Sequence, residues 1–213
     1  MPNNIEKRIR VIQGIAVNIS SNLKMYYELC DKTADVLFES SPNFFAFCRG
    51  NFYAMAIIQL EMLLGENTES NQVGLRKLLN CIEGIGNKNF YKGNTVKKEV
   101  KIICEECKEL LDAEQSLVKK IKNDRDKVFA HQDKKYAIDE TLKPLTSPED
   151  IKRGLSVVNE VLNKISEYFN ETQYLIENFY ADDIEETKII LNLYNKYYDE
   201  IEEMENRELL MKK

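Results

Sequence analysis

The chain of 213 residues has few residues that interrupt regular structure, and it contains only one histidine. Four prolines and eight glycines are few for this length, while 43% of the residues are hydrophobic and 31% are charged. This composition excludes a disordered chain and is typical of a soluble helical protein with a sizeable core.

The sequence also lacks the segments typical of secretion or membrane insertion. The N-terminal residues MPNNIEKRIR are not followed by an apolar run, so no signal peptide is predicted. The most hydrophobic stretch, residues 44–64, contains Arg49, Gln59 and Glu61 and therefore predicts a helix buried on most sides rather than a membrane span. Five cysteines without an export signal favour a reducing, cytoplasmic location, and we expect no membrane contact.

Two of the cysteines, Cys104 and Cys107, have the spacing of a redox or metal-binding pair. Both fall on an apolar stripe inside a predicted helix, whereas redox pairs lie at the start of a helix. A zinc site needs further ligands, and the chain has no second pair and a single histidine. The two cysteines are therefore predicted to be core residues, and no metal or cofactor is expected.

Apolar residues recur in steps of three and four along most of the chain, and no stretch alternates as a strand does. The pattern predicts an all-α, up-and-down bundle. Ser147 as cap, Pro148 in the first position and two acids in the first turn mark one helix start. The expected helices cover residues 5–38, 43–64, about 70–82, 95–130 with a break allowed near 112–113, 147–169, and 182–209.

Charge is unevenly distributed along the sequence. The net charge of −6 argues against general binding to nucleic acid. Residues 119–135, however, hold seven Lys or Arg and three Asp, whereas residues 182–208 hold ten Asp or Glu and three Lys or Arg. The acidic C-terminal helix is either a solvated face, the interpretation we favour, or a local counterweight to the basic segment.

The only histidine lies near an arginine that interrupts an apolar stripe. Arg125 follows Leu111, Val118 and Ile121 in the predicted helix, a costly position unless the arginine has a partner or faces a cleft. His131 lies six residues further on, about 9 Å along the helix axis, so the two side chains could flank one groove. Alternatively, Arg125 extends its charged end to solvent and His131 caps the helix C-terminus.

The longer string RDKVFAHQD, residues 125–133, resembles the signature of the HEPN superfamily, an Arg followed after four to six residues by His. A polar residue follows the Arg in that signature, and here it is Asp126. The upstream strings LEMLLG and GLRKLL resemble the abortive-infection, AbiU-type branch. The resemblance covers about residues 40–170 and implies a four-helix bundle core. The N-terminal helix 5–38 and the acidic helix 182–209 would be additions to one domain of residues 1–213.

The resemblance implies a metal-independent endoribonuclease in phage defence or a toxin–antitoxin system. The ribose 2′-hydroxyl attacks the neighbouring phosphate at a composite Arg/His site across a homodimer. Histidine can act as acid or base, and arginine presents a permanently charged fork to phosphate. The catalytic residues are then Arg125, His131 and Asp126, and RNA is bound by Lys127, Lys134 and Lys135. The partners are single-stranded RNA, a second copy of the chain and an antitoxin protein.

Two other hypotheses remain open from the sequence. One is a non-catalytic HEPN module that binds RNA, a nucleotide or a partner protein, because a fold does not fix a function. The other is a helical interaction protein that uses the apolar seam of residues 5–37. Some HEPN toxins have a modifiable Tyr two residues after the His, but Asp133 occupies that position here, so regulation through this site is not expected.

Overall fold

The structure, a computed structural model, describes residues 2–31, 34–66, 73–84, 97–126 and 144–170, and single positions at 196 and 204. These residues form helices and turns without a strand, so the predicted all-α fold is confirmed. The helices are α1 (Pro2–Glu28), α2 (Asp35–Ser40), α3 (Pro42–Leu64), α4 (Leu75–Gly84), α5 (Lys97–Ala113), α6 (Gln115–Asp124) and α8 (Pro148–Asn170). The predicted helix at 182–209 lies outside the described residues.

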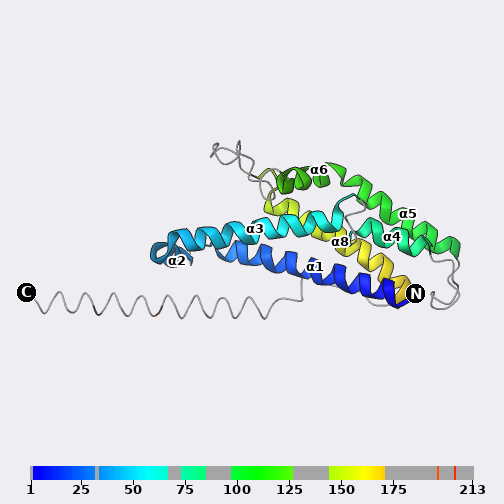
Figure 1. Cartoon of the computed structure of the whole chain (residues 1–213), viewed down its shortest axis with the longest axis horizontal. Coiled ribbons are helices and arrows are strands. Elements are labelled where there is room, and N and C mark those ends of the chain that lie inside the picture. The colour runs from blue at the N-terminus through cyan, green and yellow to red at the C-terminus, as the bar shows by residue number, and fades with distance from the viewer. Residues whose placement is uncertain are drawn as a thin grey trace, which may run out of the picture.

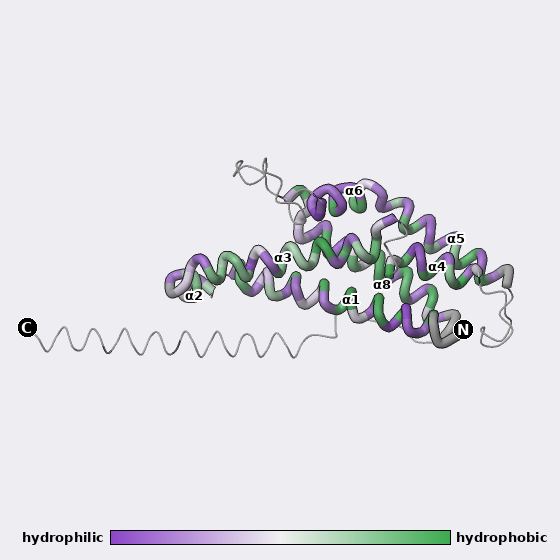
Figure 2. The backbone as a smooth tube through the Cα atoms, in the orientation of Figure 1, coloured by the Kyte–Doolittle hydropathy of each residue, from purple (hydrophilic) through white to green (hydrophobic). Residues whose placement is uncertain are grey.

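Helices α1 and α3 run side by side, and α8 contacts both of them as well as α5 (Figure 1). Apolar side chains from α1, α3, α4, α5, α6 and α8 form one continuous core. Figure 2 shows the alternation along the backbone that produces this core, with apolar residues recurring between hydrophilic ones along the helices. Burial of such periodic faces is the main force that holds a helical bundle together.

The predicted apolar seam of residues 5–37 is confirmed as one buried line over residues 5–23 only, and the predicted length of the first helix is wrong. Six seam residues are buried, namely Ile5, Ile9, Ile12, Ala16, Ile19 and Leu23. The helix ends at Glu28 instead of continuing to residue 38, and α2 begins at Asp35. The break lets Leu29, Ala34 and Leu37 pack together against Phe45 and Phe52 of α3, which buries apolar surface that a straight helix would not bring together.

Helix α3 is less buried than the sequence predicts. Its second half is in the core, with Ala56, Ile57, Leu60, Leu63 and Leu64 buried. Its first half and α2 extend past the ends of α6 and α8 (Figure 1), and Phe44 and Phe47 are exposed there. The expectation of burial on most sides is therefore wrong for the first half, because fewer helices cover it.

The predicted helix 95–130 breaks one to two residues after the expected position. Helix α5 ends at Ala113, and Glu114 has φ −98° and ψ 16° before α6 begins. The break changes the phase of the apolar stripe, so the buried line of α6 is Leu117, Ile121 and Asp124. Arg125 therefore does not continue the stripe, as the sequence suggested. It lies beside the stripe and is only partly buried.

The start of α8 is confirmed at the residues that predicted it. The backbone N–H of Asp150 donates to Ser147 Oγ over 3.1 Å, and the backbone N–H of Ser147 donates to Asp150 Oδ2 over 2.7 Å. This reciprocal pair is a capping box, and Pro148 fills the first helical position. These hydrogen bonds hold Ser147 against the first turn of α8.

The two closely spaced cysteines are core residues, as predicted. Cys104 and Cys107 are buried in α5, and burial raises the pKa of their thiols to about 12 and about 11. Such thiols are protonated at neutral pH and are unreactive. Among the helices in the described ranges, none is both long and apolar enough to cross a membrane.

Candidate functional site

The C-terminal end of α6 places three charged residues, Asp124, Arg125 and Asp126, in succession. Asp124 lies on the inward face of the helix and is fully buried. Arg125 and Asp126 are partly exposed. The backbone N–H of Arg125 still bonds to the carbonyls of Ile121 and Lys122. Arg125 is therefore the first residue after α6, and these two hydrogen bonds join its backbone to the last turn of that helix.

The Arg125 guanidinium binds two carboxylates at once. Its Nη1 donates to Glu61 Oε2 of α3 over 2.8 Å, and its Nε and Nη2 lie 2.7 and 2.6 Å from Asp126 Oδ1. The arginine thus has the partner that its position requires. Two predicted site residues, Arg125 and Asp126, are brought together, and the side chain of Arg125 is 31% exposed, so one side of the fork reaches solvent.

Glu61 is a site residue that the sequence did not identify. Its side chain is only 11% exposed, and burial raises the pKa of its carboxyl even though Arg125 lowers it. The net upward shift of the pKa means that desolvation of the charge, together with repulsion from Asp126, exceeds the attraction of Arg125 and Lys122. A buried acid in the apolar string LEMLLG was the available signal, because such a residue needs a partner from another helix.

The residue after α3, Gly65, lies directly against Glu61. A Cβ at position 65 would lie 2.6 Å from the Glu61 carbonyl oxygen and 2.8 Å from its carboxylate Oε1. Because glycine has no Cβ, the Glu61 carboxylate has room beside the end of α3. The motif LEMLLG supplies both the acid that binds Arg125 and the room for it.

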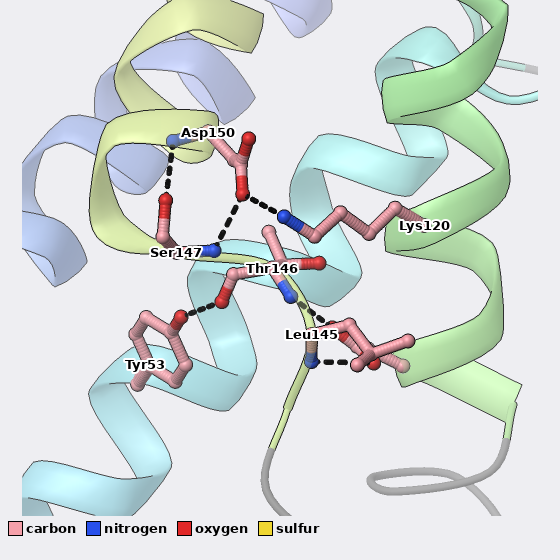
Figure 3. A network of polar contacts seen from close by, with 7 residues as sticks. Tyr53, Lys120, Leu145, Thr146, Ser147 and Asp150 are labelled. Carbon is pink, nitrogen blue, oxygen red and sulfur yellow. Dashed lines mark hydrogen bonds and ion pairs between the residues drawn. The ribbon is translucent and has the colours of Figure 1, made fainter.

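Asp124 is a second residue that the sequence did not identify as part of the site. Its two carboxylate oxygens accept the backbone N–H groups of Leu145 (3.0 Å) and Thr146 (2.6 Å). Figure 3 shows this backbone between α6 and α3, where the hydroxyl of Tyr53 donates to the carbonyl of Thr146. Asp124, the last residue of α6, therefore holds the backbone of Leu145 and Thr146 beside the end of α6.

Further ion pairs fix α6 to α8. Lys120 pairs with Asp150 (Figure 3), and Arg153 binds Glu114, which precedes α6, over 2.8 Å. Burial raises the pKa of the Asp150 carboxyl, but hydrogen bonds from Lys120 and Ser147 outweigh it and hold the pKa below the usual value. Both ends of α6 are therefore anchored, which limits the positions that Arg125 can take.

Four predicted site residues, His131, Lys127, Lys134 and Lys135, lie outside the described residues. The described part of the site is thus Arg125 with Glu61, Asp126 and Asp124. In the described ranges no three His, Cys, Asp or Glu side chains come together as a metal site would require.

Comparison with protein families supports an assignment for most of the chain. Residues 11–189 match the family model HEPN_AbiU2, described as AbiU2. The match begins within α1 and extends past α8, so it includes Glu61, Arg125 and the 127–143 segment. Comparison with curated proteins found no match, and comparison with solved structures found none either.

Proposed function

This chain belongs to the AbiU2 family of HEPN-type abortive-infection proteins, and on that premise we propose that it is a metal-independent endoribonuclease. The observation that supports the activity best is the guanidinium of Arg125, held at the surface by Glu61 and Asp126. A fixed, permanently charged fork at a helix end is suited to bind a phosphate whose negative charge increases during cleavage. RNA is the proposed substrate, and the cytoplasm is the proposed location.

The two carboxylates around Arg125 have different proposed roles. Glu61 is nearly buried and belongs to another helix, so it keeps the guanidinium in place when RNA binds. Asp126 is 40% exposed and is the neighbouring residue in sequence, so an RNA phosphate displaces it from Nε and Nη2. An incoming phosphate then forms the two-pronged contact that arginine favours.

His131 is the proposed acid or base of the reaction. Five peptide units separate it from Asp126, so the covalent chain keeps its Cα within about 18 Å of that residue. The attacking 2′-hydroxyl must lose a proton and the leaving 5′-oxygen must gain one, and a single imidazole cannot hold both protonation states at once. We assign the site to two chains, with Arg125 of one chain acting beside His131 of the other and water as the second partner in proton transfer.

The lysines near the motif, Lys127, Lys134 and Lys135, are the proposed contacts to the RNA backbone. They belong to the basic segment 119–135, which contrasts with the acidic overall charge. Contacts to phosphate are independent of sequence and weaken as salt is added. A defence or toxin role needs control of this activity, and an antitoxin protein is the proposed partner for that purpose.

The test is cleavage of a mixed pool of RNA by the purified protein with EDTA present. The wild type should cleave, and His131→Ala and Arg125→Ala should each lose about 10²–10⁴-fold in rate. Arg125→Lys should recover little, because a point charge does not replace the fork. Activity that disappears with EDTA and returns with magnesium would replace this mechanism with a metal-assisted one.

A non-catalytic HEPN module is the second candidate. The double engagement of Arg125 by Glu61 and Asp126 favours it, because an arginine with two carboxylate partners also serves as a purely structural link between α3 and α6. This candidate predicts RNA or nucleotide binding without cleavage. It also predicts that Arg125→Ala lowers the melting temperature and leaves no catalytic defect to measure.

A further inference from the structure

The outward face of α3 has no charge and is largely apolar. At about 100° per residue, Phe44, Phe47, Asn51, Met55, Ile58 and Met62 fall within about 80° of one another along about 27 Å of helix. Of the eight large hydrophobic side chains that are exposed among the described residues, four belong to this stripe. We call these six residues the α3 stripe.

The two charged residues of α3 do not place a charge on this face, because both contact other parts of the chain. Arg49 lies over the ring of Phe38, 4.9 Å from its centroid, and Glu61 binds Arg125. A helix exposed to water normally carries polar or charged residues on its outer side, whereas a helix that is apolar all round is normally covered. The α3 stripe is therefore an uncharged, partly exposed helix face of the kind that a partner normally covers.

The exposed area is large enough for the centre of an interface. Phe44 is 58% exposed and Phe47 is 68% exposed. A phenylalanine offers roughly 150–250 Å², so these two rings leave roughly 200–300 Å² of apolar surface in water. Met55 and Met62 add to it, and the total matches the size of patches that mark interaction sites. A standard interface of about 800 Å² per partner would need a polar rim around this centre.

We propose that a second copy of this chain covers the α3 stripe, with the two α3 helices parallel and in register. An uncharged stripe is complementary to itself, as a two-fold interface requires. Asn51 lies in the middle of the stripe, and among the described residues its amide has one hydrogen bond, which an N–H donates to the carbonyl of Phe47. A single Asn in an apolar seam specifies register by pairing with the same residue of the other helix.

The parallel arrangement has a consequence for the site. Met62, at one end of the stripe, is next to Glu61, which holds Arg125. Parallel helices therefore bring the two Glu61–Arg125 pairs to the same end of the interface, whereas antiparallel helices would separate them. This inference deepens the proposed function, since a site built from two chains needs the two motifs close together.

The test of the surface is the oligomeric state of the full chain, measured by size-exclusion chromatography with light scattering over a dilution series. The wild type should be a dimer, and Met55→Glu should raise its dissociation constant by about 10²–10³-fold, because an unpaired charge becomes buried in each copy. Ile102→Glu on α5 is the matched control, since Ile102 is 45% exposed and Met55 is 43% exposed. A monomeric wild type, or equal effects of both variants, would overturn the proposal.

The register is tested by oxidative cross-linking, with the wild type as the baseline for the native cysteines. Asn51→Cys alone should form a covalent dimer if the helices are parallel and in register. Antiparallel helices about the middle of the stripe would place position 51 opposite position 55. A covalent dimer that forms only in the double variant Asn51→Cys, Met55→Cys would therefore overturn the parallel register. A dimer without ribonuclease activity would defeat the proposed function and leave this surface intact.

Discussion

Arg125 and Glu61 form an ion pair in which the acid is much more buried than the base. The Arg125 side chain is partly exposed and keeps a second partner in Asp126, whereas Glu61 depends on Arg125 for its compensation. Removing the arginine leaves a buried acid without a partner, which is the more costly change. Arg125→Ala therefore combines a functional and a structural effect, and the state of Glu61 must be known to separate them.

The raised pKa of Glu61 gives a prediction about stability and pH. The folded state keeps a proton that the unfolded state has lost between the unfolded and folded pKa values, so Glu61 lowers stability as pH rises through that interval. Glu61→Gln removes this dependence. The melting temperature of the variant minus that of the wild type should therefore increase from about pH 4 to about pH 7. A constant difference across this range would show that the burial of Glu61 has no such effect.

Asp124 should be the residue at this helix end that contributes most to stability. Asp124→Ala leaves the backbone N–H groups of Leu145 and Thr146 without acceptors and should cost about 2–5 kcal/mol in the free energy of unfolding. Asp124→Asn keeps one acceptor and should cost about 1–3 kcal/mol. Denaturant unfolding measures both. Asp126→Asn, at an exposed carboxylate, is the control and should cost less than about 1 kcal/mol.

The sequence predicted only part of this group of residues. Arg125 and Asp126 were predicted because they follow a local pattern that can be read from adjacent letters. Glu61 and Asp124 were not, because each acts on a partner 21 or more positions away in the chain. Long-range pairing of a buried acid depends on which helices meet, and a single sequence does not specify that.

Among the helices, α3 and α8 make an unusually close contact at Gly154. A Cβ at this position would lie 2.7 Å from Cδ2 of the buried Leu60. Gly154→Ala should therefore force the two helices apart or Leu60 out of its position, at a cost of about 1–3 kcal/mol. Chemical unfolding of the variant beside wild type measures this cost.

The matched control for this substitution is Gly14, an exposed glycine inside α1 with no atom near its missing Cβ. Gly14→Ala should stabilise the protein by about 0.5–1 kcal/mol, because alanine favours a helix more than glycine does. If both variants were equally stabilised, the α3–α8 contact would have room for a methyl group and our account of this packing would be wrong.

For the helices, the sequence predicted their presence better than the residues at which they begin and end. The start of α8 was predicted because Ser147, Pro148 and Asp150 act through local hydrogen bonds and a fixed backbone angle. The end of α1 at Glu28 was not, because no proline or glycine marks it. The break depends on tertiary packing of Leu29 and Leu37 against α3, which local patterns do not reveal.

At the scale of the whole molecule, the proposed site requires two chains, and this can be tested by mixing inactive variants. If Arg125 of one chain acts with His131 of the other, a mixed dimer of Arg125→Ala and His131→Ala chains has one intact site and one site that lacks both groups. Random exchange yields half mixed dimers with one site of two intact, so activity should recover to about one quarter of the wild-type value. Neither variant alone should cleave RNA.

The recovery is measured by cleavage of the RNA pool after the two variants are mixed and allowed to exchange subunits. Exchange is verified separately with two affinity tags, so that a negative result cannot come from dimers that failed to mix. Adding Met55→Glu to both chains should abolish the recovery, because it disrupts the α3 stripe that is proposed to join them. The same substitution at Ile102 should leave the recovery unchanged, since α5 lies outside the proposed interface. Verified exchange without recovered cleavage would mean that Arg125 and His131 act within one chain, or that each site needs both pairs.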